Sequence, residues 1–185
     1  MTMSKFYAFV DKVIKIEGGY VNDPKDSGGE TNWGITIAVA RAFGYTGPMR
    51  DMTRQQAAEI YKARFWDSMR LDEVAAISPQ IALELFDSGV NVGTQRAGEW
   101  FQTCLNAFNQ EGSWYRDITA DGRIGPMTIA AFRDYMTRRV RNHGERVMLR
   151  ALNALQGGFY IDLSQRRQKD ERFVYGWILN RVEIA

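Results

Sequence analysis

Apolar residues recur at helical spacing over most of this 185-residue chain, and a glycine or proline follows where most of the runs end. Such runs are typical of amphipathic helices that bury one face. The predicted helices cover residues 4–17, 37–43, 51–66, 79–90, 97–108, 126–136, 147–155 and 173–182. Residues 31–35 are the best strand candidate, and this segment is short. The sequence therefore predicts a mainly α fold, with one small β-hairpin after the first helix and a helical C-terminal part.

The composition is that of a globular protein with no strong charge. Hydrophobic residues make up 45% of the chain, which is ample for a core, and the net charge of +2 demands no nucleic-acid partner. Residues 133–172 are locally basic, with ten Lys and Arg against five Asp and Glu. This surface would suit an anionic polymer, or it is simply a solvated helix face. Because aromatic and basic residues do not interleave along one stripe, we expect no nucleic acid to bind.

The scarcity of histidine and cysteine excludes several kinds of catalysis. The chain has one histidine, His143, and one cysteine, Cys104. An internal disulfide and the usual zinc ligand sets are therefore impossible. Cys104 lies on the apolar face of its predicted helix, where a packed thiol is more common than a nucleophile. A calcium-loop-like run begins at Asp117, but its twelfth position is Thr128 rather than a bidentate glutamate. We therefore expect neither a metal nor a cofactor.

Residues 16–36 combine a helix end, a glycine-rich bend and several carboxylates. Glu17 closes the first predicted helix, a glycine pair stops it, and Asp26 lies in the polar turn that follows. Glycoside hydrolysis needs a carboxylic acid and usually a second acidic group. Glu17 suits the first role, Asp26 suits the second, and Thr31 could hold a water. Alternatively, Glu17 only ends an exposed helix and the loop acids only form turns.

Three blocks of the sequence resemble known elements. The run Glu17-Gly-Gly-Tyr-Val-Asn-Asp-Pro-x-Asp-x-Gly-Gly-x-Thr-Asn-x-Gly-Ile-Thr36 resembles the signature of glycoside hydrolase family 108 muramidases, lysozyme-like enzymes of phage lysis cassettes and secretion-associated operons. The run Phe86-Asp-x-x-Val-Asn-x-Gly93 resembles the helix break that lines the family's sugar groove. Residues 120–131 resemble the Asp-Gly-x-x-Gly-Pro-x-Thr element of peptidoglycan-binding modules.

This resemblance implies a lysozyme-like fold and a muramidase of the lysozyme type. The substrate would be the β-1,4 bond between N-acetylmuramic acid and N-acetylglucosamine in peptidoglycan, with Glu17 as the catalytic acid and Asp26 and Thr31 as candidate partners. In related phage lysozymes the threonine comes one residue later, where this chain has Asn32. An inverting and a retaining mechanism therefore both stay open.

The resemblance also implies substrate-binding residues and a domain order. Tyr20, Trp33 and Trp66 are candidate sugar platforms, although core packing is the more common role for a tryptophan placed like Trp66, in a helix beside Phe65. The other candidates for substrate binding are Asn32, Thr36, Asp87, Asn91 and Asp121. Residues 1–110 would form the catalytic region, and residues 111–185 would bind glycan or stem peptides while packed on it.

Two further activities compete with hydrolysis. A lytic transglycosylase would use one glutamate and release an anhydro-sugar, and a decayed enzyme would bind peptidoglycan without cleaving it. No signal peptide or membrane span is evident in the sequence. We therefore expect synthesis in the cytoplasm, no stable membrane insertion, action on peptidoglycan in the periplasm or cell wall, and dependence on a holin-like membrane protein.

Overall fold

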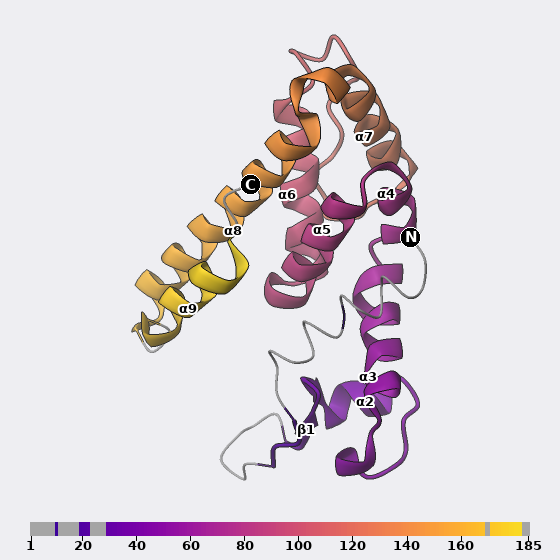
Figure 1. Ribbon diagram of the computed structural model, residues 1–185, viewed down its shortest axis with the longest axis vertical. Helices are drawn as coiled ribbons and strands as arrows, with labels where there is room; N and C mark the ends of the chain where they lie inside the picture. Colours follow the sequence, from indigo (N-terminus) through magenta and orange to yellow (C-terminus); the bar gives the residue numbers. More distant parts are fainter. Residues whose placement is uncertain (1–9, 11–18, 23–28, 169–170, 183–185) are drawn as a thin grey trace. The chain divides into compact units, whose positions relative to one another are not determined.

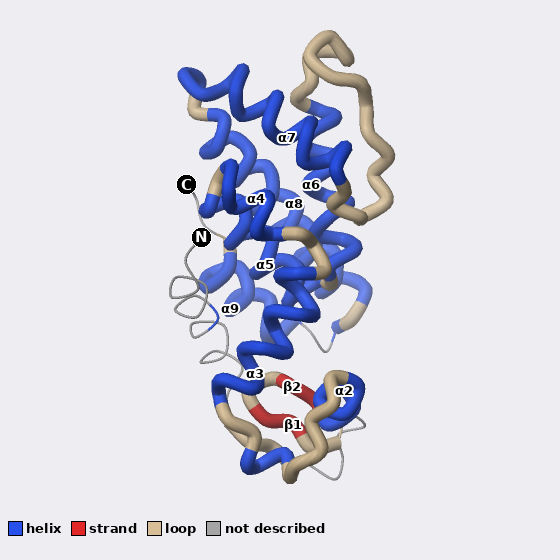
Figure 2. Tube along the Cα trace, turned by 90° about the vertical axis from the view of Figure 1, so that its right-hand side faces the viewer, coloured by secondary structure: helices blue, strands red, loops and turns tan. Residues whose placement is uncertain are grey.

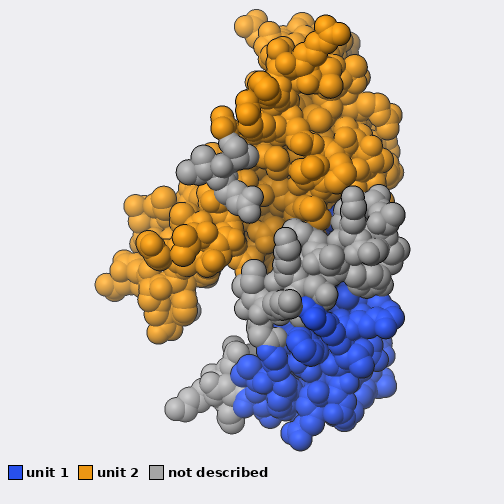
Figure 3. Space-filling model, in the orientation of Figure 1, with its two compact units in different colours: residues 1–68 blue, residues 69–185 orange. Residues whose placement is uncertain are grey.

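This computed structural model describes residues 10, 19–22, 29–168 and 171–182. The chain divides into two compact units, residues 1–68 and 69–185, coloured separately in Figure 3. The predicted helix over residues 4–17 lies outside the described residues, except for Val10, which is helical and buried. The sequence predicts a boundary after residue 110, between a catalytic region (1–110) and a binding region (111–185). The compact units divide after residue 68 instead, and they do not test which region catalyses and which binds.

The first unit contains the hairpin. Strand β1 (Thr31–Asn32) pairs antiparallel with β2 (Ile35–Thr36), so that Thr31 faces Thr36 in the register (Figure 2). Trp33 and Gly34 form the turn, and both have positive φ angles, 54° and 73°. Two central residues with positive φ are what a two-residue type I′ hairpin turn requires. The predicted strand at residues 31–35 is therefore most of a very short hairpin.

Polar caps set where the helices of the first unit begin. Thr36 caps α2 (Ile37–Ala42), and Thr53 forms a capping box with Gln56 at the start of α3 (Arg54–Tyr61). A 3₁₀ turn, η1 (Met49–Asp51), precedes α3, and a π-helical segment, η2 (Lys62–Asp67), follows it. The buried side chains of this unit include Ile35, Ala40, Met49, Met52, Ala57, Ala58, Ile60, Tyr61 and Trp66.

The second unit is a helical bundle (Figure 1). Its elements are α4 (Leu71–Ile77), α5 (Pro79–Val92), α6 (Thr94–Ala107), α7 (Pro126–Arg139), the 3₁₀ turn η3 (Val140–Asn142), α8 (Gly144–Arg166) and α9 (Glu171–Arg181). Ser78 caps α5 by accepting from the backbone N–H of Ile81, with Pro79 as the first helical residue. Gly93, with φ of 93°, separates α5 from α6.

Helices α5 and α8 organise the core of the second unit. Helix α5 packs against α4, α6 and α8, and α8 also contacts α6, α7 and α9. The rings of Phe101 and Phe132 meet edge to face, 5.1 Å between centroids, and so join α6 to α7. The fully buried large side chains here include Met69, Leu71, Ile81, Leu85, Phe86, Phe101, Leu105, Phe132 and Tyr135.

Two helices differ from the predictions. Helix α4 was not predicted, because its three buried residues span little more than one turn and Arg70 before it is left-handed and provides no cap. Helix α8 runs for 23 residues, well beyond the predicted 147–155. Gly157 interrupts its apolar pattern, yet Gly157 lies against Ile178 of α9 and Val182, which directly follows α9. Tertiary packing thus continues the helix through a residue that weakens helices locally.

The predicted fold class is confirmed: a mainly α chain with one small antiparallel hairpin and a helical C-terminal part. Among the described residues, every helix is too short or too polar to cross a lipid bilayer.

Candidate functional site

The catalytic acid expected from the sequence, Glu17, and its candidate partner, Asp26, both lie outside the described residues. What the structure describes is the neighbouring chain, residues 19–22 and the residues from 29 onward. Val21 and Thr31 form an isolated antiparallel bridge, with N–H to O=C distances of 2.8 Å and 2.9 Å. Val21 follows Glu17 by four residues, and Thr31 follows Asp26 by five. The bridge therefore holds together the two described chain segments that flank the segment containing Asp26.

Asn32 anchors this hairpin to the rest of the first unit. Its side chain is 3% exposed, and its Nδ2 donates to the backbone oxygen of Met49 at 2.7 Å. The same oxygen also accepts from the backbone N–H of Met52 at 3.2 Å, so the Asn32 amide contributes the second of two hydrogen bonds to this carbonyl. Asn32, predicted to bind substrate, therefore has a structural role in the described contacts.

We expect Asn32→Leu to lower the free energy of unfolding by about 0.5–1.5 kcal/mol, because the oxygen of Met49 then loses one of its two donors and keeps only the backbone N–H of Met52. Urea unfolding followed by circular dichroism measures this change. The control is Asn22→Leu, since Asn22 is exposed in the same stretch and should change stability by at most about 0.5 kcal/mol. An unchanged stability of Asn32→Leu together with a raised KM would instead assign Asn32 to the substrate.

The three predicted sugar platforms differ in accessibility. Trp33 is half-buried, and its Nε1 donates to the oxygen of Met52 at 2.9 Å. Tyr20 is also half-buried, with the guanidinium carbon of Arg50 5.5 Å from its ring centroid. Trp66 is only 1% exposed within η2, so its ring offers no face to a sugar in this structure. This burial favours a role for Trp66 in the core rather than in sugar binding.

The threonines of the hairpin use their polar groups within the protein. Thr36 Oγ1 accepts from the backbone N–H of Val39 at 3.4 Å and so caps α2. Thr31 is half-buried and gives both its backbone groups to the bridge with Val21. The backbone thus holds Thr31 at a defined position in the hairpin.

Asp87 and Asn91 lie one helical turn apart on α5, in the second unit. Asn91 Nδ2 donates to Asp87 Oδ2 at 3.1 Å, and Arg181 from α9 forms an ion pair with Asp87 Oδ1 at 3.2 Å. Gln156 from α8 donates to Asp87 Oδ2 at 3.4 Å. The side chain of Arg181 is 8% exposed and that of Asp87 is 20% exposed. Sequence reasoning missed Gln156 and Arg181, because they are far from Asp87 along the chain.

Asp121 belongs to a hydrogen-bonded turn that is built on Gln102 of α6. Gln102 is 2% exposed; its Nε2 donates to Asp121 Oδ1 at 3.0 Å and its Oε1 accepts from the N–H of Gly122 at 2.8 Å. The N–H of Arg123 also donates to Asp121 Oδ1, and these two bonds, the backbone one first, lower the pKa of Asp121. The Asp-Gly element therefore has a structural role that the sequence alone did not reveal.

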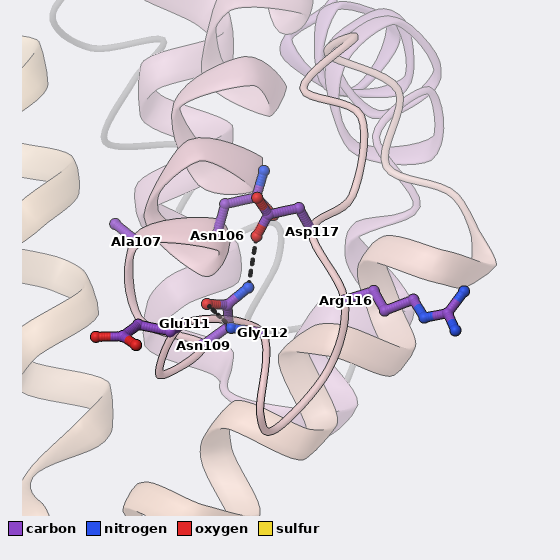
Figure 4. Close-up of a pocket in the computed structure, with 7 residues that line it drawn as sticks. All are labelled: Asn106, Ala107, Asn109, Glu111, Gly112, Arg116 and Asp117. Atoms are coloured by element: carbon purple, nitrogen blue, oxygen red, sulfur yellow. Dashed lines mark hydrogen bonds between the residues drawn. The ribbon is translucent and has the colours of Figure 1, made fainter.

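The loop after α6 surrounds an open hollow of about 630 Å³ (Figure 4). Asn109 Nδ2 donates to Asp117 Oδ1 at 2.6 Å across it, and Asn106 exchanges two hydrogen bonds with the backbone of Ile118. Figure 4 shows the side chains of Glu111 and Arg116 pointing away from this central pair. The hollow is lined by Asn106, Ala107, Asn109, Glu111, Gly112, Arg116 and Asp117.

Cys104 and the possible metal ligands can be located among the described residues. Cys104 is 4% exposed, and burial raises the pKa of its thiol to about 11, so the thiolate is scarce at neutral pH. Across the described ranges, no three His, Cys, Asp or Glu side chains gather in a possible metal-binding group.

Comparison with known families accounts for nearly the whole chain. Residues 10–93 match glycosyl hydrolase 108, and residues 96–182 match the predicted peptidoglycan domain. The chain thus combines a glycosyl hydrolase 108 region with a C-terminal predicted peptidoglycan domain. It is therefore a glycoside hydrolase that acts on peptidoglycan, and peptidoglycan is its partner.

A solved structure has a fold similar to that of this chain. SagA of Brucella abortus is similar with a TM-score of 0.57 and 24% sequence identity, over 96% of this chain and 97% of that one. At this identity the similarity concerns the fold alone. A search among curated proteins finds no significant match.

The Asp87–Arg181 ion pair joins the two regions that match different families. Asp87 and Asn91 fall in the glycosyl hydrolase 108 match, whereas Gln156 and Arg181 fall in the peptidoglycan-domain match. All four lie in the compact unit of residues 69–185. The two matched regions of this glycosyl hydrolase 108 protein therefore share a core, and polar bonds join them there.

Proposed function

We propose that this glycosyl hydrolase 108 protein is a muramidase of the lysozyme type. It hydrolyses the β-1,4 bond between N-acetylmuramic acid and N-acetylglucosamine, and Glu17 protonates the leaving oxygen as general acid. Asp26 is the proposed second carboxylate, and Thr31 is the proposed holder of the attacking water. The enzyme would act in the periplasm or cell wall, where peptidoglycan is found.

The observation that carries this proposal is the bridge between Val21 and Thr31 inside the glycosyl hydrolase 108 match. A hydrolytic site needs its acid and its water-activating group on opposite sides of one sugar bond. The bridge brings the chain just after Glu17 beside the chain just after Asp26, which is the kind of closure such a site requires. The anchor from Asn32 to Met49 holds the same strand in place.

Tyr20 and Trp33 are the proposed sugar platforms, because each keeps a half-buried aromatic ring near this bridge in the sequence. Aromatic faces pack against the apolar faces of pyranose rings. Asp87 and Asn91 are proposed to contact the glycan from the end of α5, where both side chains are partly exposed.

The proposal predicts the chemical form of the products. We expect digestion of purified sacculi to release muropeptides with a reducing N-acetylmuramic acid, each carrying one added water. Mass spectrometry measures this, because an anhydro-sugar is lighter by that water. Anhydro-muropeptides would assign a lytic transglycosylase instead, and sedimentation with sacculi without any released product would assign a binding protein.

A further inference from the structure

Two arginine side chains of α7 lie over the indole of Trp114, in the loop between α6 and α7. The guanidinium carbon of Arg139 is 4.6 Å from the ring centroid, and that of Arg138 is 5.6 Å from it. Both distances are within the range of cation–π attraction, which is stronger for tryptophan than for other side chains. The ring thus holds two neighbouring positive charges close together.

The donors of these two guanidinium groups are available to an external anion. Among the described residues, neither Arg138 nor Arg139 forms a hydrogen bond or an ion pair with a carboxylate, and Trp114 is their aromatic contact. Arg138 is exposed, while Arg139 and Trp114 are half-buried. A guanidinium presents its N–H donors in a planar fork that matches a carboxylate bidentately.

The loop that carries Trp114 is held by several hydrogen bonds. The backbone N–H of Trp114 donates to the backbone oxygen of Asn109 at 3.2 Å. The hydroxyl of Tyr115 donates to the backbone oxygen of Leu105 at 2.8 Å. Asn109 is 3% exposed and also accepts from the N–H of Gly112 at 2.9 Å. The indole is therefore presented from a supported backbone, which lowers the entropy cost of binding.

We propose that Trp114, Arg138 and Arg139 form a recognition site for a carboxylate of a peptidoglycan stem peptide. This inference rests on the proposed function, since it takes peptidoglycan as the substrate. The stem peptides carry free carboxylates, which the two guanidinium groups can bind by charge-assisted hydrogen bonds. The indole offers an apolar face to the peptide beside them.

Nearby acidic residues favour a peptide over a polyanionic surface. Asp134 and Asp117 lie close enough to interact electrostatically with Tyr115, the residue after Trp114, and Glu111 belongs to the same loop. These carboxylates would repel a continuous row of phosphates. A stem peptide instead carries amino groups as well as carboxylates, so it can meet both signs of charge.

The test is isothermal titration of the full-length protein with a stem tetrapeptide that an amidase has released from sacculi. We expect Arg138→Gln/Arg139→Gln to bind it at least about tenfold more weakly than the wild type. We expect the wild type to bind the methyl-esterified peptide at least about tenfold more weakly too. The control is Arg133→Gln/Arg146→Gln, which removes the same charge from two other exposed positions and should keep the affinity.

Several results would overturn the inference. These are equal affinity of the Arg138/Arg139 variant and the wild type, an equal loss in the control, unchanged affinity for the esterified peptide, or no binding by the wild type. Binding to phosphatidylglycerol vesicles that the variant loses, without tetrapeptide binding, would assign an anionic lipid surface. If the wild type cleaves sacculi while the variant binds the tetrapeptide normally, this inference fails and the proposed function stands. If instead the Arg138/Arg139 variant loses affinity for the tetrapeptide while the wild type cleaves no glycan, this inference stands and the proposed function fails.

Discussion

Glu17→Gln should lower kcat/KM on purified sacculi by about 10²–10⁴-fold, because glutamine cannot give a proton to the leaving glycosidic oxygen. Turbidity loss of a sacculus suspension measures the rate, and sedimentation with sacculi measures binding. We expect binding to be kept, since the substitution changes neither the shape nor the size of the side chain. Loss of rate without loss of binding is the signature of a group that acts in the chemical step.

The matched control is Glu30→Gln, which makes the same change in the same stretch at a half-exposed position. It should keep the wild-type rate. Asp26→Asn distinguishes the mechanisms: a strong loss is expected if Asp26 is the second carboxylate, and a small one if Glu17 works alone. If Glu17→Gln cleaves sacculi as fast as the wild type, Glu17 is not the acid and the proposed mechanism is wrong.

Gly98→Ala should lower the free energy of unfolding by about 2–3 kcal/mol, the upper part of the range of about 1–3 kcal/mol that is typical of overpacking. A Cβ built at Gly98 in α6 would lie 2.1 Å from the backbone oxygen of Gly122 and 2.7 Å from its carbonyl carbon. Backbone atoms cannot rotate away, so the turn that carries Asp121 must move off the helix. Urea unfolding followed by circular dichroism measures the loss.

Gly158→Ala is the control for this substitution, because Gly158 is also inside a helix and no atom lies within 4 Å of its Cβ position. Alanine should stabilise α8 there by up to about 1 kcal/mol through helix propensity alone. A Gly98→Ala variant as stable as the wild type would show that α6 and the turn at Gly122 are not in close contact in solution.

Local signals in the sequence were sufficient for much of the fold. Ser78-Pro79 predicts the start of α5, and Thr36 predicts the start of α2, because a cap acts within one turn of its own residue. Helix α4 and the length of α8 could not be predicted in this way. Gly157 weakens the helix locally, and its contact with α9 involves residues more than twenty positions away.

For the candidate site, the sequence supplied the motif but not the partners of its residues. The run from Glu17 to Thr36 carries the family resemblance, and the glycosyl hydrolase 108 match over residues 10–93 includes it. Asn32 lies within that motif, yet only the structure shows that its amide donates to Met49, 17 residues away. Likewise, Arg181 pairs with Asp87 across 94 residues, a separation at which one sequence carries no pairing signal.

The sequence by itself determined the mainly α fold class and, through the motif from Glu17 to Thr36, the peptidoglycan-directed family. Each of these depends on spacing and residue type over short distances. Only the tertiary structure decided that Trp66 is buried, that Gln102 organises the Asp121 turn, and that Arg138 and Arg139 meet Trp114. Burial and long-range hydrogen bonds depend on which surfaces come together when the helices pack, and that information is spread over the whole chain.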